Sequence, residues 1–349
     1  MKRETAHVHA GSRRRVGADE ARRSMRRRLL IVLGAGAFAA PLACFAAQPA
    51  KVARVGYLGP TSAAGAKSRV EALRAGLREL GYVEGKNLVI EFRWADDRYE
   101  RLPALMAELA GLKVDVIVTH STPGTRAAKQ ATTTIPIVMA HAGDAVIAGL
   151  VANVARPDGN VTGSTFSTPE LAAKRLEVLR DTFPRIRRVA LLQNPDNPAM
   201  GPVLKAMQQT ANALQLELQQ IGVRTPDELE GAFLAMAAKR AEAVVAIEDA
   251  MLNGNIEKIA DLAAKHRLPA IGLPELAEAG GLLAYGVDLI QMFRRAAYFV
   301  DKILKGVKVS ALPVERATRF ELVLNMKTAK GLGLKIPQSI LVRADRVIK

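Results

Sequence analysis

Short apolar runs alternate with amphipathic helical segments over most of this chain, and this alternation most limits its fold. Four runs in the first half are separated by leucine and alanine at helical spacing, and they lie at residues 52–58, 87–94, 114–119 and 135–139. Four more follow at residues 188–193, 216–223, 243–247 and 269–273. Strands that alternate with helices form parallel sheets with right-handed crossovers. The sequence therefore predicts an α/β fold with two series of parallel strands, each long enough to build its own lobe.

Between the two series lies a turn-rich stretch, ARPDGNVTGSTF, at residues 155–166. Proline presets φ, aspartate and asparagine can bond their own backbone, and glycine accepts a positive φ, so residues 157–160 have the composition of a turn. We interpret the stretch as the first crossover between the lobes. A crossover at a lobe boundary is where a hinge would lie, and the facing lobe edges would form a cleft.

Composition excludes some classes of protein. With 349 residues, of which 49% are hydrophobic and 24% charged, the chain has the make-up of a globular protein with about two domains. The formal net charge is +16, but the first 47 residues hold ten Lys/Arg against three Asp/Glu, which gives them +7 and leaves +9 for the rest. Aromatic residues make up 4%, and no basic stripe with interleaved aromatics is present. We therefore expect no nucleic-acid partner.

Residues 1–46 are organised as an upstream extension and a secretory signal peptide. Three arginines at residues 26–28 precede an apolar run at residues 29–40, and small residues follow, which is the order of regions in such a signal. The run is shorter than the about 20 residues that a membrane-spanning helix needs. Cleavage before Ala47 would release the mature chain, and the Arg-Arg-x-Leu-Leu order also allows the twin-arginine route. We therefore expect export to the periplasm.

Two features of this region leave alternatives open. Met25 could be the true start, because residues 1–24 are polar, basic and patternless. Cys44, the only cysteine, could carry a lipid anchor, but Pro41 stands where leucine is usual, which disfavours a lipoprotein. Cleavage after Ala46 would leave a mature chain without a thiol, and such a chain suits an oxidising periplasm.

Motifs for nucleotide, nicotinamide and hydrolase chemistry are missing. Residues 59–68, GPTSAAGAKS, differ from a P-loop because one extra residue separates the glycines and Ala66 precedes the lysine, which breaks the spacing of backbone amides that binds phosphate. The fingerprint G-x-G-x-x-G does not follow the first strand, and Ser121 lacks a G-x-S-x-G elbow. His120 and His141, with Asp144, could meet at the strand ends, but they lack a tight metal-binding spacing. We therefore expect no metal and no cofactor.

Acidic and amide side chains end apolar runs in both halves of the chain, namely Asp144, Asn194, Glu248 and Asp249. Any one of them could instead cap a helix, as Asp and Asn commonly do. Together they supply hydrogen-bonding groups at the carboxyl ends of strands, where such sheets bind ligands, without an arranged nucleophile and base. This pattern predicts a binding cleft rather than an enzyme active site.

Several short runs carry a family resemblance: RVGYL at residues 54–58, Gly143-Asp144, ARPDGNVTG at residues 155–163, Asn194-Pro195 and LGLKIP at residues 332–337. From residue 52 to residue 348 the chain resembles the periplasmic substrate-binding proteins of ABC importers, especially the family that includes aromatic amino-acid binders. The resemblance implies a class I periplasmic-binding-protein fold, in which two Rossmann-like lobes with parallel sheets are joined by three crossovers and close on a solute. Ala145 stands where the family often has proline, which loosens the loop at Asp144.

The resemblance also supplies two returns of the chain between the lobes. We expect the N-terminal lobe to comprise residues 52–160 and 280–310, and the C-terminal lobe to comprise residues 161–279 and 311–349. The hinges are expected near residues 160–165, 273–281 and 306–313.

The predicted function is that of the periplasmic solute-binding component of an ABC import system. It would be a monomer that captures a small polar or amino-acid-like molecule and delivers it to a permease in the inner membrane. The candidate ligand-binding residues are Thr61, Ser62, Ser121, Thr122, Asp144, Thr165, Asn194, Asp249 and Tyr285. Among them, Asp144 or Asp249 would pair with an ammonium group. The alternative is a periplasmic sensor with the same cleft, which would pass its closed form to a signalling receptor.

Overall fold

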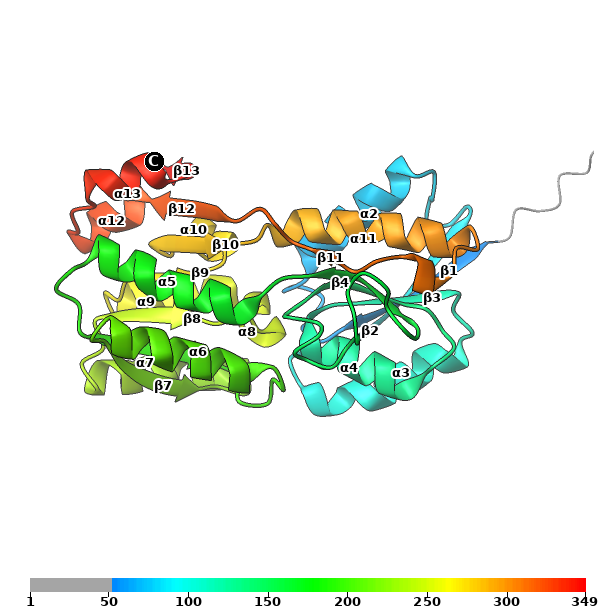
Figure 1. Ribbon diagram of the computed structural model, residues 1–349, viewed down its shortest axis with the longest axis horizontal. Coiled ribbons are helices and arrows are strands. Elements are labelled where there is room, and N and C mark those ends of the chain that lie inside the picture. The colour runs from blue at the N-terminus through cyan, green and yellow to red at the C-terminus, as the bar shows by residue number, and fades with distance from the viewer. Residues whose placement is uncertain (1–51) are drawn as a thin grey trace, which may run out of the picture. The chain divides into compact units, whose positions relative to one another are not determined.

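The computed structural model describes residues 52–349, and their strands form two separate sheets (Figure 1). The first sheet has the strand order β11-β5-β4-β3-β1-β2, and the second has the order β13-β12-β10-β9-β8-β6-β7. Within the described residues the strands pair in parallel except β10 with β12. The predicted α/β fold with two sets of parallel strands is confirmed. The signal peptide predicted in residues 1–46, with Met25 and Cys44, lies outside the described residues.

Helices cover both faces of the first sheet. Its strands are β1 (Ala53–Gly59), β2 (Leu88–Trp94), β3 (Val116–Thr119), β4 (Ile137–Ala142), β5 (Val161–Thr165) and β11 (Glu315–Arg316). The helices are α2 (Lys67–Glu79), α3 (Leu102–Gly111), α4 (Ser121–Ala131) and α11 (Leu289–Leu304), with 3-10 turns η1 (Tyr99–Arg101) and η3 (Val309–Ala311). Side chains alternate along β3, so that Val116 and Val118 pack with α2 and α11 while Ile117 packs with α3 and α4.

Two helices of this lobe, α2 and α11, pack closely side by side. In α2, Val70, Leu73 and Leu77 recur at helical spacing and are buried against the sheet. Gly76 makes the close approach to α11 feasible, because a Cβ atom there would lie 2.6 Å from the carbonyl oxygen of Arg294. The helix α11 follows β10 of the second sheet in sequence, so this packing brings a late segment of the chain back to the first lobe.

The second sheet is built in the same way. Its strands are β6 (Arg188–Gln193), β7 (Glu217–Gly222), β8 (Ala243–Ala246), β9 (Ala270–Gly272), β10 (Leu283–Gly286), β12 (Glu321–Asn325) and β13 (Arg346–Ile348). The helices are α5 (Thr168–Thr182), α6 (Met200–Ala213), α7 (Leu229–Ala238), α8 (Ala250–Gly254), α9 (Ile256–Lys265), α10 (Pro274–Glu278), α12 (Met326–Leu332) and α13 (Gln338–Arg343), with the 3-10 turn η2 (Pro226–Glu228). One face of the sheet packs with α5 and α6 and the other with α7 and α9.

The chain passes between the two sheets three times, and each passage lies beyond the predicted limit. β5, assigned from the sequence to the C-terminal lobe, pairs with β4 of the first sheet, and β11 pairs with β5. β10, assigned to the N-terminal lobe, pairs with β9 and β12 of the second sheet. The passages therefore lie at residues 166–167, 287–288 and 317–320, not at residues 160, 280 and 310. Hydrogen-bonded neighbours decide where a strand belongs, and the apolar pattern does not reveal them.

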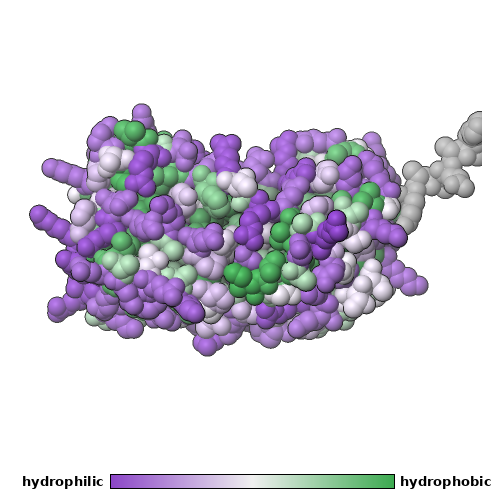
Figure 2. All heavy atoms as spheres, in the orientation of Figure 1, coloured by the Kyte–Doolittle hydropathy of each residue, from purple (hydrophilic) through white to green (hydrophobic). Residues whose placement is uncertain are grey.

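The surface gives no sign of a membrane-spanning element within residues 52–349, where no helix is both long enough and apolar enough to cross a bilayer. Figure 2 shows a face covered mainly by hydrophilic residues, with hydrophobic residues in small separate groups. Scattered exposed apolar residues of this kind are normal for a globular protein.

A first prediction concerns Gly163, which has a φ of +126° and lies opposite Met139 in the pairing of β5 with β4. A Cβ atom at this position would overlap the backbone carbonyl of Met139, and both the clash and the backbone strain oppose any side chain. We expect Gly163→Ala to lower the free energy of unfolding by about 3 kcal/mol, as measured by chemical denaturation. The matched control is Gly231→Ala in α7, where the added methyl group meets no atom within 4 Å and should stabilise by up to about 1 kcal/mol. Equal effects of the two changes would contradict the prediction.

Candidate ligand-binding cleft

A narrow cavity lies between the carboxyl ends of the strands of the two sheets. Its lining comes from both lobes and comprises Ser121, Thr122, His141, Gly143, Phe166, Thr168, Asn197, Ala199, Met200, Glu248, Asp249 and Asn253. Its volume is about 20 Å³, which is little more than the ~10–15 Å³ that one water molecule needs. The two lobes are therefore closed onto each other at the edge where parallel sheets bind ligands.

The strongest link between the lobes joins Tyr99 of the first to Asp249 of the second. The Tyr99 hydroxyl lies 2.8 Å from both carboxylate oxygens of Asp249 and accepts a hydrogen bond from the backbone N–H of Met251 at 3.1 Å. Burial, followed by the negative charge of Asp249, raises the pKa of Tyr99 well above its usual value. The phenol therefore stays protonated and donates its hydrogen bond to the carboxylate at neutral pH.

Further contacts between the lobes surround this link. Arg69 of α2 donates from Nη2 to the carbonyl oxygen of Asn253 at 2.9 Å. Asn255 donates from Nδ2 to the carboxylate of Asp97 at 3.2 Å. Thr61, one of the predicted ligand-binding residues, is fully buried against Gly254. Helix α8 and Asn255, the residue after it, therefore contact the first lobe through α2 and through the loops that follow β1 and β2.

Asp249 uses its carboxylate mainly to hold the protein together. It accepts hydrogen bonds from two backbone N–H groups of α8, at 3.0 and 3.4 Å, and so caps that helix. The side-chain amides of Asn194 and Asn197 donate to it at 3.3 and 3.0 Å. Burial raises the pKa of Asp249, while the hydrogen bonds from Tyr99, Asn194 and Asn197 lower it. Little acceptor capacity is left for the ammonium group that the sequence assigned to this residue.

The structure brings only some of the predicted ligand-binding residues together. Ser121, Thr122 and Asp249 line the cavity, and Asn194 lies directly behind Asp249. Ser121 adopts a φ of +58°, unusual for a residue with a side chain. The other predicted residues do not belong to this lining, and they are Thr61, Ser62, Asp144, Thr165 and Tyr285.

Asp144 and Thr165 stabilise the loop that follows β4. Asp144 accepts from two backbone N–H groups of this loop at 3.1 and 3.0 Å, and its other oxygen lies 3.3 Å from Arg316. Thr165 accepts from the N–H of Ala145 at 3.0 Å and donates to the carbonyl oxygen of Gly143 at 2.8 Å. Both side chains are therefore occupied within the first lobe.

Ser62 and Tyr285 also have partners within their own lobes. The hydroxyl of Ser62 accepts from the N–H of Gly65 at 3.2 Å, which closes the turn before α2. Tyr285 stacks on Phe320 with ring centroids 6.0 Å apart. Their roles in ligand binding stay predictions.

Several buried polar atoms in the two lobes have no protein partner. They include the Tyr57 hydroxyl, Thr61 Oγ1, Arg69 Nε, Asp97 Oδ1, both ring nitrogens of His120, Ser121 Oγ, His141 Nδ1, Glu248 Oε2 and both carboxylate oxygens of Glu275. Ser121, His141 and Glu248 line the cavity, and the Tyr57 and His141 rings lie 6.4 and 5.4 Å from that of His120. Most buried polar groups in proteins are hydrogen-bonded, so this concentration marks a place suited to a polar guest.

The two histidines belong to a cluster of rings on the α11 side of the first sheet. Phe293 of α11 lies 5.4 Å from His120 and 5.7 Å from His141, and Phe166 lies 6.1 Å from His141, measured between ring centroids. Burial lowers the pKa of His120 well below its usual value and the pKa of His141 to about 3, and the charge of Arg69 adds to both shifts. Both imidazoles are therefore neutral at physiological pH. Among residues 52–349, no group of three His, Cys, Asp or Glu side chains could hold a metal ion.

Sequence reasoning missed Arg69 and Glu275 because both lie within helices rather than in the loops after strands. The sequence did contain a signal for Arg69, which shares the buried face of α2 with Leu73 and Leu77. A charged residue on the apolar face of an amphipathic helix needs a partner. Glu275 carries a weaker signal, since it lies three residues after the end of β9 at Gly272.

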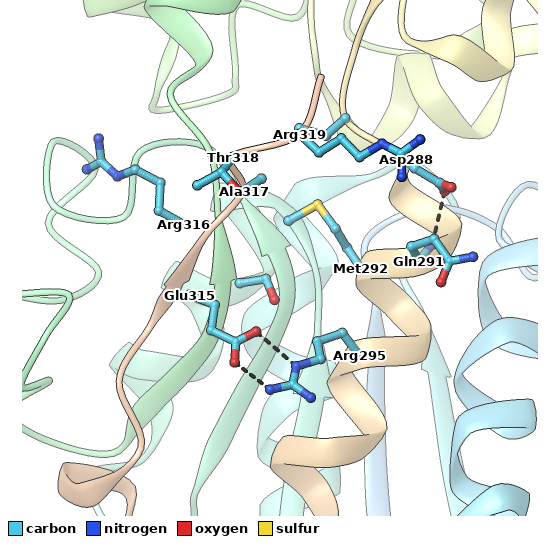
Figure 3. Close-up of a pocket in the computed structure, with 11 residues that line it drawn as sticks. Asp288, Gln291, Met292, Arg295, Glu315, Arg316, Ala317, Thr318 and Arg319 are labelled. Atoms are coloured by element: carbon cyan, nitrogen blue, oxygen red, sulfur yellow. Dashed lines mark hydrogen bonds and ion pairs between the residues drawn. The ribbon is translucent and has the colours of Figure 1, made fainter. Parts of the chain in front are cut away.

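A larger cavity, of about 300 Å³, lies beside the hinge passages instead of between the strand ends (Figure 3). Arg295 of α11 and Glu315 of β11 face each other across it with hydrogen bonds of 2.9 and 2.6 Å. Asp288 accepts from the N–H of Gln291 at 3.0 Å. The buried polar atoms without a partner that line a cavity, on Ser121, His141 and Glu248, belong to the smaller cavity, so that cavity is the better candidate for the ligand site.

Comparison with known proteins identifies the family. Residues 55–348 match the family model of the ABC transporter substrate binding protein. The chain belongs to this family. It is therefore a substrate-binding protein of an ABC transporter, which binds small ligands and is not an enzyme.

Relatives of this substrate-binding protein support the fold. It is 26% identical to a tyrosine-binding protein of Clostridioides difficile over 260 aligned residues, and these residues make up 74% of each chain. A crystal structure of a conserved domain protein from Vibrio cholerae shows a TM-score of 0.78 and 26% identity over 85% of this chain and 100% of that chain. The Streptococcus pneumoniae ABC domain in complex with L-Trp shows a TM-score of 0.76 and 23% identity over 85% of this chain and 99% of that chain. These structures confirm the two-lobe class I periplasmic-binding-protein fold.

The neutral histidines give this substrate-binding protein a characteristic pH dependence. Because the folded pKa of His141 is about 3 and that of an unfolded histidine is about 6.5, the unfolded state binds an extra proton between these values. Stability should thus fall as pH is lowered below 6.5, by about 1.4 kcal/mol per pH unit for each such histidine. Chemical denaturation at pH 6.5 and at pH 5.0 gives the change in the free energy of unfolding between these two pH values. His141→Gln should make this change smaller by the contribution of one histidine. An unchanged slope in the variant would contradict the prediction.

The link between Tyr99 and Asp249 should control how far the lobes stay closed. We expect Tyr99→Phe to lower the closed-to-open ratio about 10- to 100-fold, because a hydrogen bond to a charged group contributes ~1.5–3 kcal/mol. Small-angle scattering would then give a larger radius of gyration for the variant than for the unchanged protein. Tyr298→Phe is the control, since the Tyr298 ring contacts side chains of its own helix α11. The same radius for all three proteins would refute the role of the link.

Proposed function

We propose that this protein is the solute-binding component of an ABC import system and captures a small polar or amino-acid-like molecule between its lobes. The observation that carries the proposal is the set of buried, unpartnered polar atoms that both lobes contribute around one closed gap. Such atoms destabilise a protein unless something bonds to them, so the gap suits a polar guest. The tyrosine-binding relative, at 26% identity, favours an amino-acid-like solute.

Binding would work by closure about the three passages at residues 166–167, 287–288 and 317–320. Each passage is short, so small changes of backbone angle in a few residues could swing one lobe against the other. A solute that bonds to both lobes touches them together only in the closed form. It would therefore shift the population toward closure by its difference in affinity for the two forms.

The closed form would then be the species that an inner-membrane permease recognises. In that form the contacts of Tyr99 with Asp249 and of Arg69 with Asn253 fix the relative position of the two lobe surfaces. A permease that contacts both surfaces could thereby distinguish a loaded binding protein from an open one. Export of a monomer to the periplasm would bring the protein to this partner.

A direct test uses the purified chain from residue 47 to residue 349. A solute at 100 times its Kd should stabilise the folded state by about 2.7 kcal/mol, which raises the melting temperature by several degrees. We expect one or more amino acids in a panel of amino acids, sugars and small organic acids to do so, and scattering to show a smaller radius of gyration with that solute. Chemical conversion of the bound compound, or no stabilisation by any member of the panel, would refute the proposed function.

A further inference from the structure

The inference begins with Arg69, a buried cation without a carboxylate partner. Its side chain is only 3% exposed. Nη2 bonds to the carbonyl oxygen of Asn253 at 2.9 Å, Nη1 bonds more weakly to that of Gly65 at 3.4 Å, and Nε has no partner. Among residues 52–349 no acidic side chain forms an ion pair with it. A guanidinium group in this position is stabilised when it binds an anion.

Glu275 is its counterpart in the second lobe. Both carboxylate oxygens are buried, and no other residue donates a hydrogen bond to them. Burial raises the pKa of Glu275, and the positive charge of Arg69 is the main influence that lowers it. Burial likewise lowers the pKa of Arg69, and the charge of Glu275 raises it. Pro274, the residue before Glu275, lies beside Gly286 together with Arg175, which bonds to Glu248 of the cavity lining. Glu275 is thus placed near the cavity edge of the second lobe, and no ion pair joins it to Arg69.

Most of the other charges near the gap are already compensated. Arg175 is fully buried and bonds directly to Glu248, and Asp249 is held by Tyr99, by two asparagine amides and by the N–H groups of α8. The imidazoles of His120 and His141 are neutral. Asp97 of the first lobe accepts a hydrogen bond from Asn255 on one oxygen and keeps the other without a partner. Arg69 and Glu275 remain as a buried cation and a buried anion in opposite lobes, and neither has an ion-pair partner among the described residues.

We propose that Arg69 and Glu275 are the residues that select a zwitterionic solute, with Arg69 binding its anionic group and Glu275 its cationic nitrogen. The inference rests on the proposed function and deepens it, because it assigns the charge recognition of the same cleft to residues other than Asp144 and Asp249. A solute with one charge of each sign offers an anionic group to Arg69 and a cationic nitrogen to Glu275, two charged side chains that make no ion pair among the described residues. The Tyr57 hydroxyl and Ser121 Oγ supply further hydrogen-bonding groups beside the pair.

Arg69 also couples recognition to closure. Its guanidinium already links α2 to the carbonyl oxygen of Asn253 in the second lobe, while its free Nε remains available to the solute. An anionic group bound there would hold the guanidinium in place, and the cationic nitrogen would reach Glu275 only after the lobes meet. A zwitterion therefore bonds to both lobes, whereas a singly charged analogue satisfies only one of them.

The test compares solutes that lack one charge with variants that lack the matching side chain. Calorimetric titration would use L-tyrosine and L-tryptophan, the acids without the amino group (3-(4-hydroxyphenyl)propionate and indole-3-propionate) and the amines without the carboxylate (tyramine and tryptamine). We expect the unchanged protein to bind one of the amino acids at least tenfold more tightly than its acid or its amine. Glu275→Gln should weaken the amino acid about 10- to 100-fold and leave the acid within about threefold. Arg69→Gln also removes the closing contact with Asn253, so it should weaken every solute to some extent. It should weaken the amino acid at least tenfold more than the amine.

Two surface variants serve as matched controls. Glu257→Gln changes an exposed carboxylate on α9 of the same lobe as Glu275, and Arg78→Gln changes an exposed guanidinium on the same helix as Arg69. Neither should alter any of the affinities. Arg69→Lys keeps the positive charge and should retain most of the preference for the amino acid over the amine. Should Arg69→Gln fail to fold, which its melting curve would show, Glu275→Gln and Arg69→Lys still decide the matter.

The outcomes separate this inference from the proposed function. If Glu275→Gln weakens the amino acid and its acid equally, or weakens neither, the charge assignment is overturned while solute binding stands. It is also overturned if the unchanged protein prefers the acid or the amine, or binds only uncharged solutes. If no solute of any class stabilises the chain, both the inference and the proposed function fail.

Discussion

The carboxylate of Asp249 is a point at which hydrogen bonds from both lobes meet. It caps α8, receives two asparagine amides from the loop after β6 and accepts the hydroxyl of Tyr99 from the opposite lobe. These donors come from three different segments, so the carboxylate fixes the strand ends of the second sheet and the closed position of the first lobe together. The cavity between the lobes is narrow because this bond and its neighbours hold its walls.

The same closed geometry explains why unpartnered polar atoms persist in the interior. The walls are held by buried contacts between the lobes, such as those of Arg69 with Asn253 and of Asn255 with Asp97. Burying a polar group without a partner opposes folding by ~1–3 kcal/mol. A protein whose large apolar cores support each sheet can sustain several such groups at a site where a polar guest satisfies them.

The distinction between occupied and available side chains also decides how the site is interpreted. Asp144 and Asp249 are the acidic residues that a strand-end pattern favours, yet hydrogen bonds within the protein occupy both. Arg69 and Glu275 lie on helices, so the strand-end pattern does not select them. Arg69 nevertheless has an unused hydrogen-bond donor, and Glu275 has unused acceptors. Strand ends reveal which edge of a sheet forms a cleft, but only the contacts show which side chains there can still bind something.

The sequence by itself determined the α/β class, the two sets of parallel strands and the edge at which a cleft forms, because these follow from local periodicity and from turn residues. It also carried the short runs, such as residues 155–163, that mark the family. The sheet to which β5, β10 and β11 belong was decided only by tertiary structure, since a strand is placed by hydrogen bonds to segments far away in the chain. The pairing of Tyr99 with Asp249, and that of Arg69 with Asn253, depend on two lobes meeting in space, and no pattern along one segment encodes such contacts.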